Sequence, residues 1–263
     1  MDIIVCIKWV PDTSEADVAV GPDEKDIETG DLDYDINNWD RFALEEAVQI
    51  KEKTGAKVTA VSVAPEDAEQ MLREALARGA DEAVHLWDDA FDGSDGFAVA
   101  SILAAFIKSR SCDLVLTGTQ ADDDCATQLG GMLAGMLDVP NASLVHKVDI
   151  DDGKAQIVRE LEGGLSEALE IDLPAVISIA TGLNEPRFVS IRAVRKVAAI
   201  EIPVLGMGEI GIGEASVGFQ GSKIEIEKLF LPPEGEGAEI ISGSPEEAAE
   251  RLAAILKEKG GIS

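Results

Sequence analysis

The stretch LVLTGTQADDDCATQLGGMLAGML, residues 114–137, contains the pattern that decides the fold. It begins with an apolar run, Leu114–Thr117, that predicts a buried strand, and it ends with Cys125–Leu137, which predicts a helix. Three consecutive aspartates lie in the loop between them. A buried strand that leads through a loop into a helix is the unit from which helix-covered parallel sheets are built.

The same alternation of short apolar runs and amphipathic segments extends over the first two-thirds of the chain. Further strands are predicted at Ile3–Ile7, Val58–Val63 and Val84–Trp87. Further helices are predicted at Trp39–Lys53, between Pro65 and Gly79, and at Phe97–Lys108. The alternation predicts a three-layer α/β/α fold with a mostly parallel, doubly wound sheet.

Beyond Pro140 the pattern changes to alternating polar and apolar residues, and the pair Gly163–Gly164 favours a tight turn. The predicted strands of this region are Leu144–Val148, Ala155–Leu161, Leu165–Ile171 and Pro174–Ile179. The last of these is a buried strand, and the two that flank the glycines predict an antiparallel hairpin appended to the sheet.

The last part of the chain has few long regular segments. From Thr181 onward it is rich in Gly and Pro until Pro245–Lys259, which predicts a closing helix. A segment with so little core of its own is expected to form an extended arm that lies on another surface.

The charge balance limits the possible partners. The 263 residues include 51 acidic and 22 basic side chains, which gives a formal net charge of −29 and a pI near 4.2. Such a charge disfavours binding to nucleic acid or anionic lipid. The longest apolar run, Phe97–Ile107, is shorter than the roughly 20 residues that span a bilayer, and the N-terminus starts as a strand without a basic leader. We expect a cytoplasmic chain without membrane insertion.

Several motifs for catalysis or metal binding fail on inspection. The three cysteines are an odd number without CxxC spacing, so we expect reduced thiols rather than disulfides or zinc ligands. His85 and His146 lie in predicted strands and are expected to be ordinary sheet residues. The glycines of residues 206–211 match GxGxxG, but Gly-rich rather than helical sequence follows them. No catalytic or metal-binding residue is assigned.

The loop Gly118–Gly130 is the best candidate for a binding site. In open α/β sheets ligands bind at the carboxyl ends of strands, where a helix N-terminus offers free N–H groups to an anion. A nucleotide phosphate fits there, but three aspartates oppose it unless they cap the helix or hold a metal. The spacing leaves open a phosphate loop, a capping loop with Asp123 or Asp124 as N-cap, and a metal site.

A second informative segment is Pro186–Ile200, which contains no acidic residue in a strongly acidic chain. A positive patch in a negative field suits an acidic partner, because complementary charge steers encounter. Ile191 and Val194 lie among the charges and can supply an apolar anchor. The alternative is an amphipathic helix whose basic face is only solvated. The basic residues are Arg187, Arg192, Arg195 and Lys196.

At these two segments the sequence resembles the β subunits of electron transfer flavoproteins, a family that includes the FixA proteins. The similarity covers nearly the whole chain, and its last block, LNEPR at residues 183–187, is highly specific. The matching motifs are Val5–Thr13, Asn37 with Ala43–Ala47, Leu72–Asp81, the residues Gly118, Gln120, Ala121 and Asp123 with Gln128–Gly130, Val158–Glu160 with Gly163–Gly164, and Pro174–Val176.

The resemblance implies an adenine-nucleotide alpha-hydrolase-like (Rossmann-like) domain at residues 1–185, a partner-recognition segment at 186–200, and a C-terminal arm and helix at 201–263 that pack on an α subunit. It implies an obligate heterodimer in which α holds the redox-active FAD and β holds a structural AMP. The heterodimer would carry electrons from acyl-CoA or related dehydrogenases to a quinone oxidoreductase or another acceptor, and β would catalyse no reaction of its own.

The resemblance also assigns residues. The dehydrogenase-recognition loop maps onto Arg187–Lys196, with Ile191 at the apolar anchor, and Glu160 falls at an acidic position that pairs with the mobile flavin domain of α. The implied nucleotide contacts are Cys6, Lys8, Asp12, Asn37, Asn38, Trp39, Val63, Gln120, Ala121, Asp123, Asp124, Ala126, Thr127, Gln128, Leu129 and Gly130.

Two alternatives accompany this reading. Electron-bifurcating relatives carry in β a second FAD that takes a hydride from NADH, and Val10–Thr13 has the form common among them. Those relatives tend to have threonines where this chain has Gly96 and Val99, and Arg159–Glu160 with Asn184–Arg187 is closer to AMP-type subunits, so we expect AMP. The other alternative is a stand-alone nucleotide-binding module.

Overall fold

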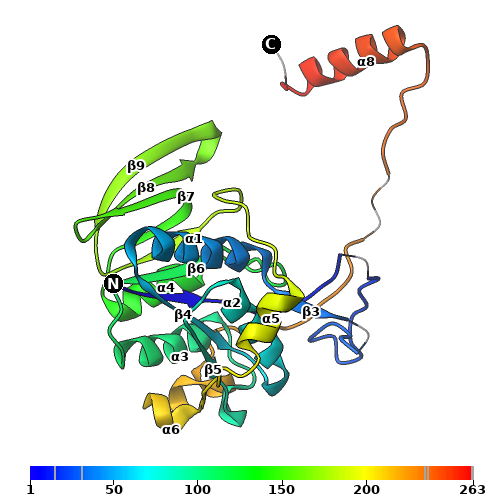
Figure 1. Cartoon of the computed structure of the whole chain (residues 1–263). Helices are drawn as coiled ribbons and strands as arrows, with labels where there is room; N and C mark the ends of the chain where they lie inside the picture. The colour runs from blue at the N-terminus through cyan, green and yellow to red at the C-terminus, as the bar shows by residue number, and fades with distance from the viewer. Residues whose placement is uncertain (15, 31, 234, 236, 262–263) are drawn as a thin grey trace. The chain divides into compact units, whose positions relative to one another are not determined.

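The computed structural model describes residues 1–14, 16–30, 32–233, 235 and 237–261. The chain divides into two compact units (Figure 1). The first unit comprises Met1–Ala19 and Glu28–Glu227, and the second comprises Val20–Ile27 and Lys228–Ser263. All candidate site residues belong to the first unit.

The first unit is built on a large sheet (Figure 1). Its strands are β1 (Asp2–Cys6), β4 (Lys57–Val63), β5 (Glu82–Leu86), β6 (Leu114–Gly118), β7 (Asn141–Asp151), β8 (Lys154–Leu161), β9 (Leu165–Asp172), β10 (Ala175–Ile179) and β11 (Val204–Leu205). Among the described residues these nine strands lie in the order β11-β5-β4-β1-β6-β10-β7-β8-β9. Neighbours are parallel from β11 to β7 and antiparallel from β7 to β9, which confirms the mostly parallel sheet with an appended hairpin.

Helices cover both faces of the sheet. They are α1 (Asn38–Thr54), α2 (Glu69–Arg78), α3 (Gly96–Lys108) and α4 (Leu129–Leu137). Successive residues of β1 point into different layers: Ile3 and Val5 pack with α1 and α2, whereas Ile4 and Cys6 pack with α3 and α4. The predicted three-layer α/β/α architecture is therefore confirmed.

Short elements complete the fold. An antiparallel ribbon of β2 (Trp9–Pro11) and β3 (Tyr34–Ile36) precedes α1. The short helices are η1 (Glu66–Ala68), η2 (Asp89–Phe91), η3 (Glu162–Gly164), α5 (Ile191–Val197), α6 (Met207–Ile210), η4 (Glu214–Ser216) and α7 (Gly218–Gly221). Helix α8 (Pro245–Glu258) confirms the predicted closing helix. Within the described part of the chain, no helix has the length and apolar character needed to cross a membrane.

The order in which strands are added to the sheet reverses next to β1. The chain passes from β1 through α1 to β4 and β5 on one side, and then through α3 to β6 on the other side of β1. Such a switch point leaves a crevice at the carboxyl ends of the two central strands, where ligands bind in open α/β sheets. The ends of β1 and β6 therefore mark the place to look for a site.

The helix predicted at Cys125–Leu137 begins only at Leu129. Cys125 and Thr127 have φ angles of 48° and 56°, which a right-handed helix does not contain. Instead the carboxylate of Asp124 accepts a hydrogen bond from the backbone N–H of Ala126 at 2.9 Å and stabilises a local turn. Residues 119–128 thus form a loop, which we call the aspartate loop, and its residues 122–128 are exposed.

The short helix α6 lies among the glycines of residues 206–211. Just before it, β11 pairs with the sheet edge at His85 and Leu86. The side chains of Ile210 and Val217 are buried against the core of the first unit. Residues 201–227 therefore belong to the first unit, and the chain from residue 228 belongs to the second.

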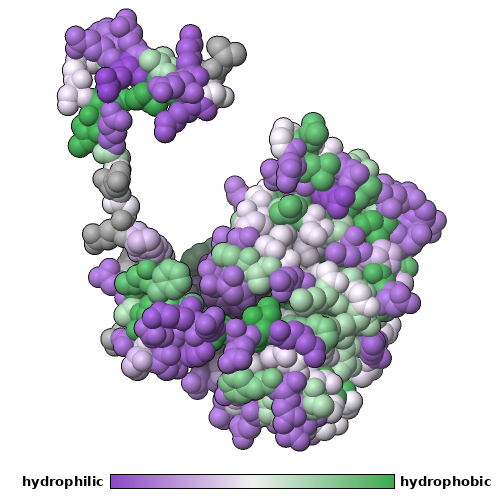
Figure 2. Space-filling view, turned by 180° about the vertical axis from the view of Figure 1, so that it is seen from behind, coloured by the Kyte–Doolittle hydropathy of each residue, from purple (hydrophilic) through white to green (hydrophobic). Residues whose placement is uncertain are grey.

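In the second unit, α8 is an amphipathic helix. It begins with a reciprocal capping box between Ser244 and Glu247, which fixes its start. Leu252 and Leu256 are 49% and 39% exposed, so green hydrophobic atoms lie beside purple hydrophilic ones on this helix (Figure 2). The expectation that this helix packs on a partner stays a prediction.

Residues 184–200, which we call the basic segment, are fastened to α1 at their start. The guanidinium of Arg187 forms ion pairs with Glu45 and Glu52, both at 2.8 Å. Burial alone would raise the pKa of Glu45, but the bonds from Arg187 outweigh it and hold that pKa below its usual value. Asn184 adds hydrogen bonds to the carbonyl of Phe42 and to a carboxylate of α1, each at 3.1 Å.

The end of the basic segment is held by α2. Arg73 donates hydrogen bonds to the carbonyl oxygens of Val197 and Ala198 at 3.0 and 3.1 Å. These are last-turn carbonyls of α5, which lack partners within a helix, so Arg73 acts as a C-terminal cap. The basic segment is thus held at both ends, with α5 between the two attachments.

Replacing Arg187 by alanine is expected to destabilise the first unit by about 2 kcal/mol, because it leaves the buried Glu45 carboxylate without its charged partner. The expected loss is smaller than for a fully buried pair, since the Arg187 side chain is one-third exposed. Chemical denaturation of the full chain measures this difference.

Two further variants show whether the stability loss of Arg187→Ala comes from its ion pair with Glu45. Adding Glu45→Gln to Arg187→Ala is expected to recover part of the loss, because the stranded charge is removed. Arg195→Ala, at an exposed position of α5, is the control and is expected to change stability by less than about 0.5 kcal/mol. Equal losses for Arg187→Ala and Arg195→Ala would contradict the fastening role of Arg187.

Candidate functional site

Asp40, in the first turn of α1, joins the two strand ends at the switch point. One carboxylate oxygen accepts the backbone N–H of Lys8 at 2.8 Å, just beyond β1. The other accepts the backbone N–H of Gly118 at 2.9 Å, at the end of β6. Gly118 allows this approach, because a Cβ there would lie 2.5 Å from the Asp40 carboxylate. One side chain therefore connects β1, β6 and α1.

Burial raises the pKa of Asp40 to about 7 from its usual 3.8, although hydrogen bonds to the carboxylate oppose the shift. The folded chain consequently binds this proton more tightly than the unfolded chain does. The stability that this adds is complete below about pH 4 and is lost as the pH rises through about 7. The ionised carboxylate is thus kept at a cost to folding, which is common where a group has a functional task.

Asn37 ties the aspartate loop to the start of α1. This asparagine is buried, and its amide Nδ2 donates to the carbonyl of Gln120 at 2.9 Å. Its Oδ1 accepts the backbone N–H of Asp122 at 3.1 Å, and the Asp122 carboxylate in turn accepts the N–H of Asn38 at 3.0 Å. The loop and the first turn of α1 therefore hold each other through side chain and backbone together.

Lys8 pairs with the two other aspartates of the loop. Its Nζ lies 2.7 Å from a carboxylate oxygen of Asp123 and 2.9 Å from one of Asp124. Burial alone would lower the pKa of Lys8, but the bonds to both aspartates outweigh it and raise that pKa. The aspartates are therefore partly neutralised by a cation of the same site, which weakens their repulsion of an anion.

The N-terminus of α4 lies against the sheet at the exit of the aspartate loop. A Cβ on Gly130 would lie 2.1 Å from Oγ of Ser178 on β10, so glycine is required for this approach. Gln128 stands at the N-cap, and among the described residues its side chain makes no capping bond. First-turn N–H groups have no acceptor within their own helix, so those of α4 are available to an anion.

These contacts bear on the three interpretations of the aspartate loop, as a helix cap, a metal site or a phosphate loop. Asp123 and Asp124 precede the N-cap residue of α4 and bond to Lys8, so the expectation that one of them caps α4 is wrong. Over the described ranges, no group of three or more His, Cys, Asp or Glu side chains is arranged to hold a metal ion. The arrangement suits a phosphate bound by backbone N–H groups.

Other predicted nucleotide contacts lie around the same crevice. Cys6 and Val63 end the adjacent strands β1 and β4, and burial raises the pKa of the Cys6 thiol. Trp39 follows Asn38 in the first turn of α1, and its Cβ lies close to Gly118. The remaining ones, along the loop and into α4, are Ala121, Ala126, Thr127 and Leu129.

Asp12 is not brought to the crevice by any described bond, and Glu160, which was predicted to meet the flavin domain of α, lies on the hairpin. Asp12 is exposed, and its carboxylate accepts the backbone N–H of Ser14 at 3.0 Å. Glu160 is exposed on β8 and pairs across the hairpin with Ser166 of β9. Asp40 and Asp122 are the residues of the site that sequence reasoning missed.

The basic segment divides its cations between two tasks. Arg187 is occupied by Glu45 and Glu52, whose bonds raise its pKa, so it fastens the segment. Ile191 of α5 is 75% exposed. The outward cations, all exposed, are Arg192, Arg195 and Lys196.

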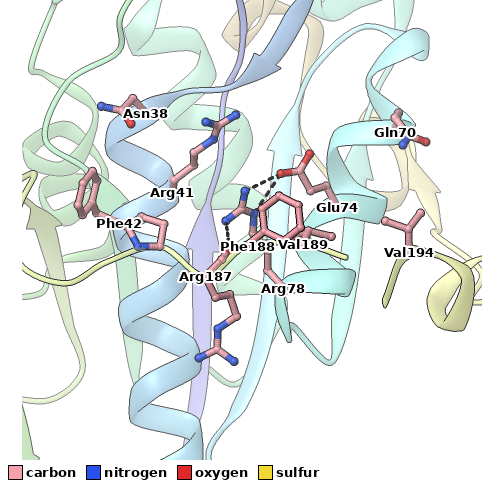
Figure 3. Close-up of a pocket in the computed structure, with 11 residues that line it drawn as sticks. Asn38, Arg41, Phe42, Gln70, Glu74, Arg78, Arg187, Phe188, Val189 and Val194 are labelled. Atoms are coloured by element: carbon pink, nitrogen blue, oxygen red, sulfur yellow. Dashed lines mark hydrogen bonds and ion pairs between the residues drawn. The ribbon is translucent and has the colours of Figure 1, made fainter. Parts of the chain in front are cut away.

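A groove of about 480 Å³ lies between α1, α2 and the basic segment. Figure 3 shows Arg78 behind Phe188, with its guanidinium bonded to Glu74 and to the carbonyl of Arg187, at 2.7 and 2.8 Å. Phe188 is 93% exposed beside this groove, and no sequence pattern points to it.

Comparisons with known proteins identify the family of this chain. Residues 26–205 match the family model described as the electron transfer flavoprotein domain. The chain is 37% identical to an electron transfer flavoprotein subunit beta of Methylophilus methylotrophus, over 99% of this chain and 100% of that protein. It is 37% identical to the caffeyl-CoA reductase-Etf complex subunit CarD of Acetobacterium woodii (98% and 99% covered) and 34% identical to the subunit beta of Bos taurus (98% of each). Nearly complete coverage of such relatives shows that the chain belongs to the electron transfer flavoprotein family, as one of its β subunits.

Proposed function

We propose that this β subunit pairs with an α subunit that holds the redox-active FAD, keeps a structural AMP at its own switch point, and presents the basic segment to an acyl-CoA or related dehydrogenase. The observation that carries the proposal is the aspartate loop, tied to α1 by Asn37 and to β1 by Lys8, and followed by an α4 N-terminus open to an anion. A structural role suits a nucleotide that binds only the folded chain and so stabilises it.

The residues present fit an adenylate. The N–H groups from Thr127 to Gly130 would bind the phosphate, and the close contact of Gly130 with Ser178 leaves the start of α4 in a fixed place. Val63, half-buried at the end of β4, offers apolar surface to a purine, and the buried Cys6 ends the neighbouring strand β1. When bound, the nucleotide would supply binding energy rather than chemistry.

The basic segment fits a docking role because its outward cations are exposed while its inner face is fastened. Charges on a strongly negative chain steer an acidic partner only if they stay solvent-accessible and local, as Arg192, Arg195 and Lys196 do. Ile191 supplies exposed apolar surface next to them. Glu160 on the hairpin is proposed to contact the flavin domain of α. A quinone oxidoreductase is proposed as the electron acceptor. The heterodimer is proposed to act in the cytoplasm.

The identity of the bound nucleotides tests the proposal. The heterodimer of this chain with its α-type partner is purified and denatured, and the released small molecules are quantified by chromatography. We expect one AMP and one FAD per heterodimer. Two FAD molecules with bleaching by NADH would contradict the AMP proposal and support the electron-bifurcating alternative, and a stable β chain that needs no partner would support a stand-alone module.

Charge reversal tests the docking role. Arg192→Glu and Arg195→Glu are each expected to slow electron uptake from the dehydrogenase by about threefold to tenfold at low salt, and to flatten its salt dependence, because steering is lost. Stopped-flow reduction of the flavin at several ionic strengths measures both effects.

The matched control is Lys57→Glu, which makes the same charge change at the start of β4, away from the carboxyl ends of the strands. Its side chain is half-exposed and pairs only with Glu82 among the described residues, so the fold is expected to tolerate it. Equal slowing by Lys57→Glu would show that net charge alone sets the rate and would remove the docking role.

A further inference from the structure

We propose that Asp40 is a positioning residue for the nucleotide: its carboxylate sets the spacing of β1 and β6 at the switch point and thereby holds both sides of the binding crevice in register. This inference rests on the proposed nucleotide binding, but it assigns the task to a residue outside the contacts implied by the family resemblance.

The first step is where the ladder between the two strands stops. β1 and β6 pair in parallel at Ile3, Ile4 and Val5, and the register ends at Val5 with Leu116. Beyond that point each strand still has a backbone donor, at Lys8 and at Gly118, and the Asp40 carboxylate accepts both. The side chain thus continues the connection between the strands where their own hydrogen bonds have ended.

The second step is the chemistry of the bridge. Two donors converge on one side chain, one on each oxygen, so the group must present two acceptors. An ionised carboxylate does so, whereas an asparagine amide offers one acceptor and would turn N–H groups towards the other donor. The missing Cβ of Gly118 completes the fit, because no other residue lets the strand end approach Asp40 so closely.

The third step connects the bridge to the site. Lys8 is held by its backbone at Asp40, and its Nζ reaches Asp123 and Asp124 in the aspartate loop. Gly118, held by the other oxygen, is the last residue before that loop. The loop is therefore positioned from both directions by one carboxylate, and loosening the bridge would displace the groups that face the phosphate.

The test compares Asp40→Asn with Asp113→Asn in the full heterodimer. Asp113 joins the same two strands at their opposite end, where, among the described residues, its carboxylate accepts only the N–H of Asp2, at 2.8 Å. Asparagine can satisfy a single donor there, so the control keeps its bond while undergoing the same chemical change. The measurements are the AMP content after gel filtration and the dissociation constant for added AMP.

We expect Asp40→Asn to weaken AMP binding by about tenfold or more, and Asp113→Asn to bind as the wild type does. Wild-type affinity in Asp40→Asn would overturn the positioning role, even with a lowered melting temperature, because a purely structural role changes stability without changing the dissociation constant. A wild-type heterodimer that binds no AMP would instead contradict the proposed function.

If Asp40→Asn does not fold, the pH dependence of AMP binding by the wild type tests the positioning role of Asp40. A protonated carboxyl resembles the amide in having lost one acceptor, so AMP binding is expected to weaken about fourfold between pH 8 and 6.5 as Asp40 takes up its proton. The other titratable groups around the bridge are Cys6 at the end of β1, Lys8 just beyond it, and Asp123 and Asp124 from the loop. A dissociation constant that stays level over this range would overturn the proposal.

Discussion

Parallel strands that separate at a switch point leave backbone donors with no partner strand, and this constraint shapes the site described here. The buried carboxylate of Asp40 lies between Lys8 and Gly118 and accepts both of their backbone N–H groups. The solution has a thermodynamic cost, because burial favours the protonated form that the bridge does not use. Asn37 and the aspartate loop are held beside the ends of these two strands, and the start of α4 packs against Ser178 of β10.

The distribution of ion pairs separates holding from recognition in a chain that has few cations to use. Lys8 fixes the aspartate loop, and Arg73 and Arg187 fix the two ends of the basic segment. These cations form ion pairs or hydrogen bonds with carboxylates or carbonyl groups of the same chain. Under the docking proposal, the exposed cations of α5 act on a partner without supporting the fold, so that stability and recognition fall on different residues.

The fold was largely predictable because buried parallel strands appear in a sequence as short apolar runs, and Gly163–Gly164 marked the hairpin turn. The start of α4 was not, because Cys125 and Thr127 adopt positive φ angles without being glycine. Asp40 looked like an ordinary acidic residue in a first helical turn, where it complements the helix dipole. Its true partners lie 32 and 78 positions away in sequence, and no local pattern reports such contacts.

The cap that Arg73 places on α5 affects which exposed side chains of the basic segment can be substituted. Arg73 binds carbonyl oxygens, which every amino acid possesses, so the attachment does not depend on the side chains that α5 displays. Exposed positions such as Phe188 and Ile191 are therefore free to vary while the backbone beneath them keeps its course. A lineage could exchange one redox partner for another by surface substitution alone, with the scaffold inherited intact.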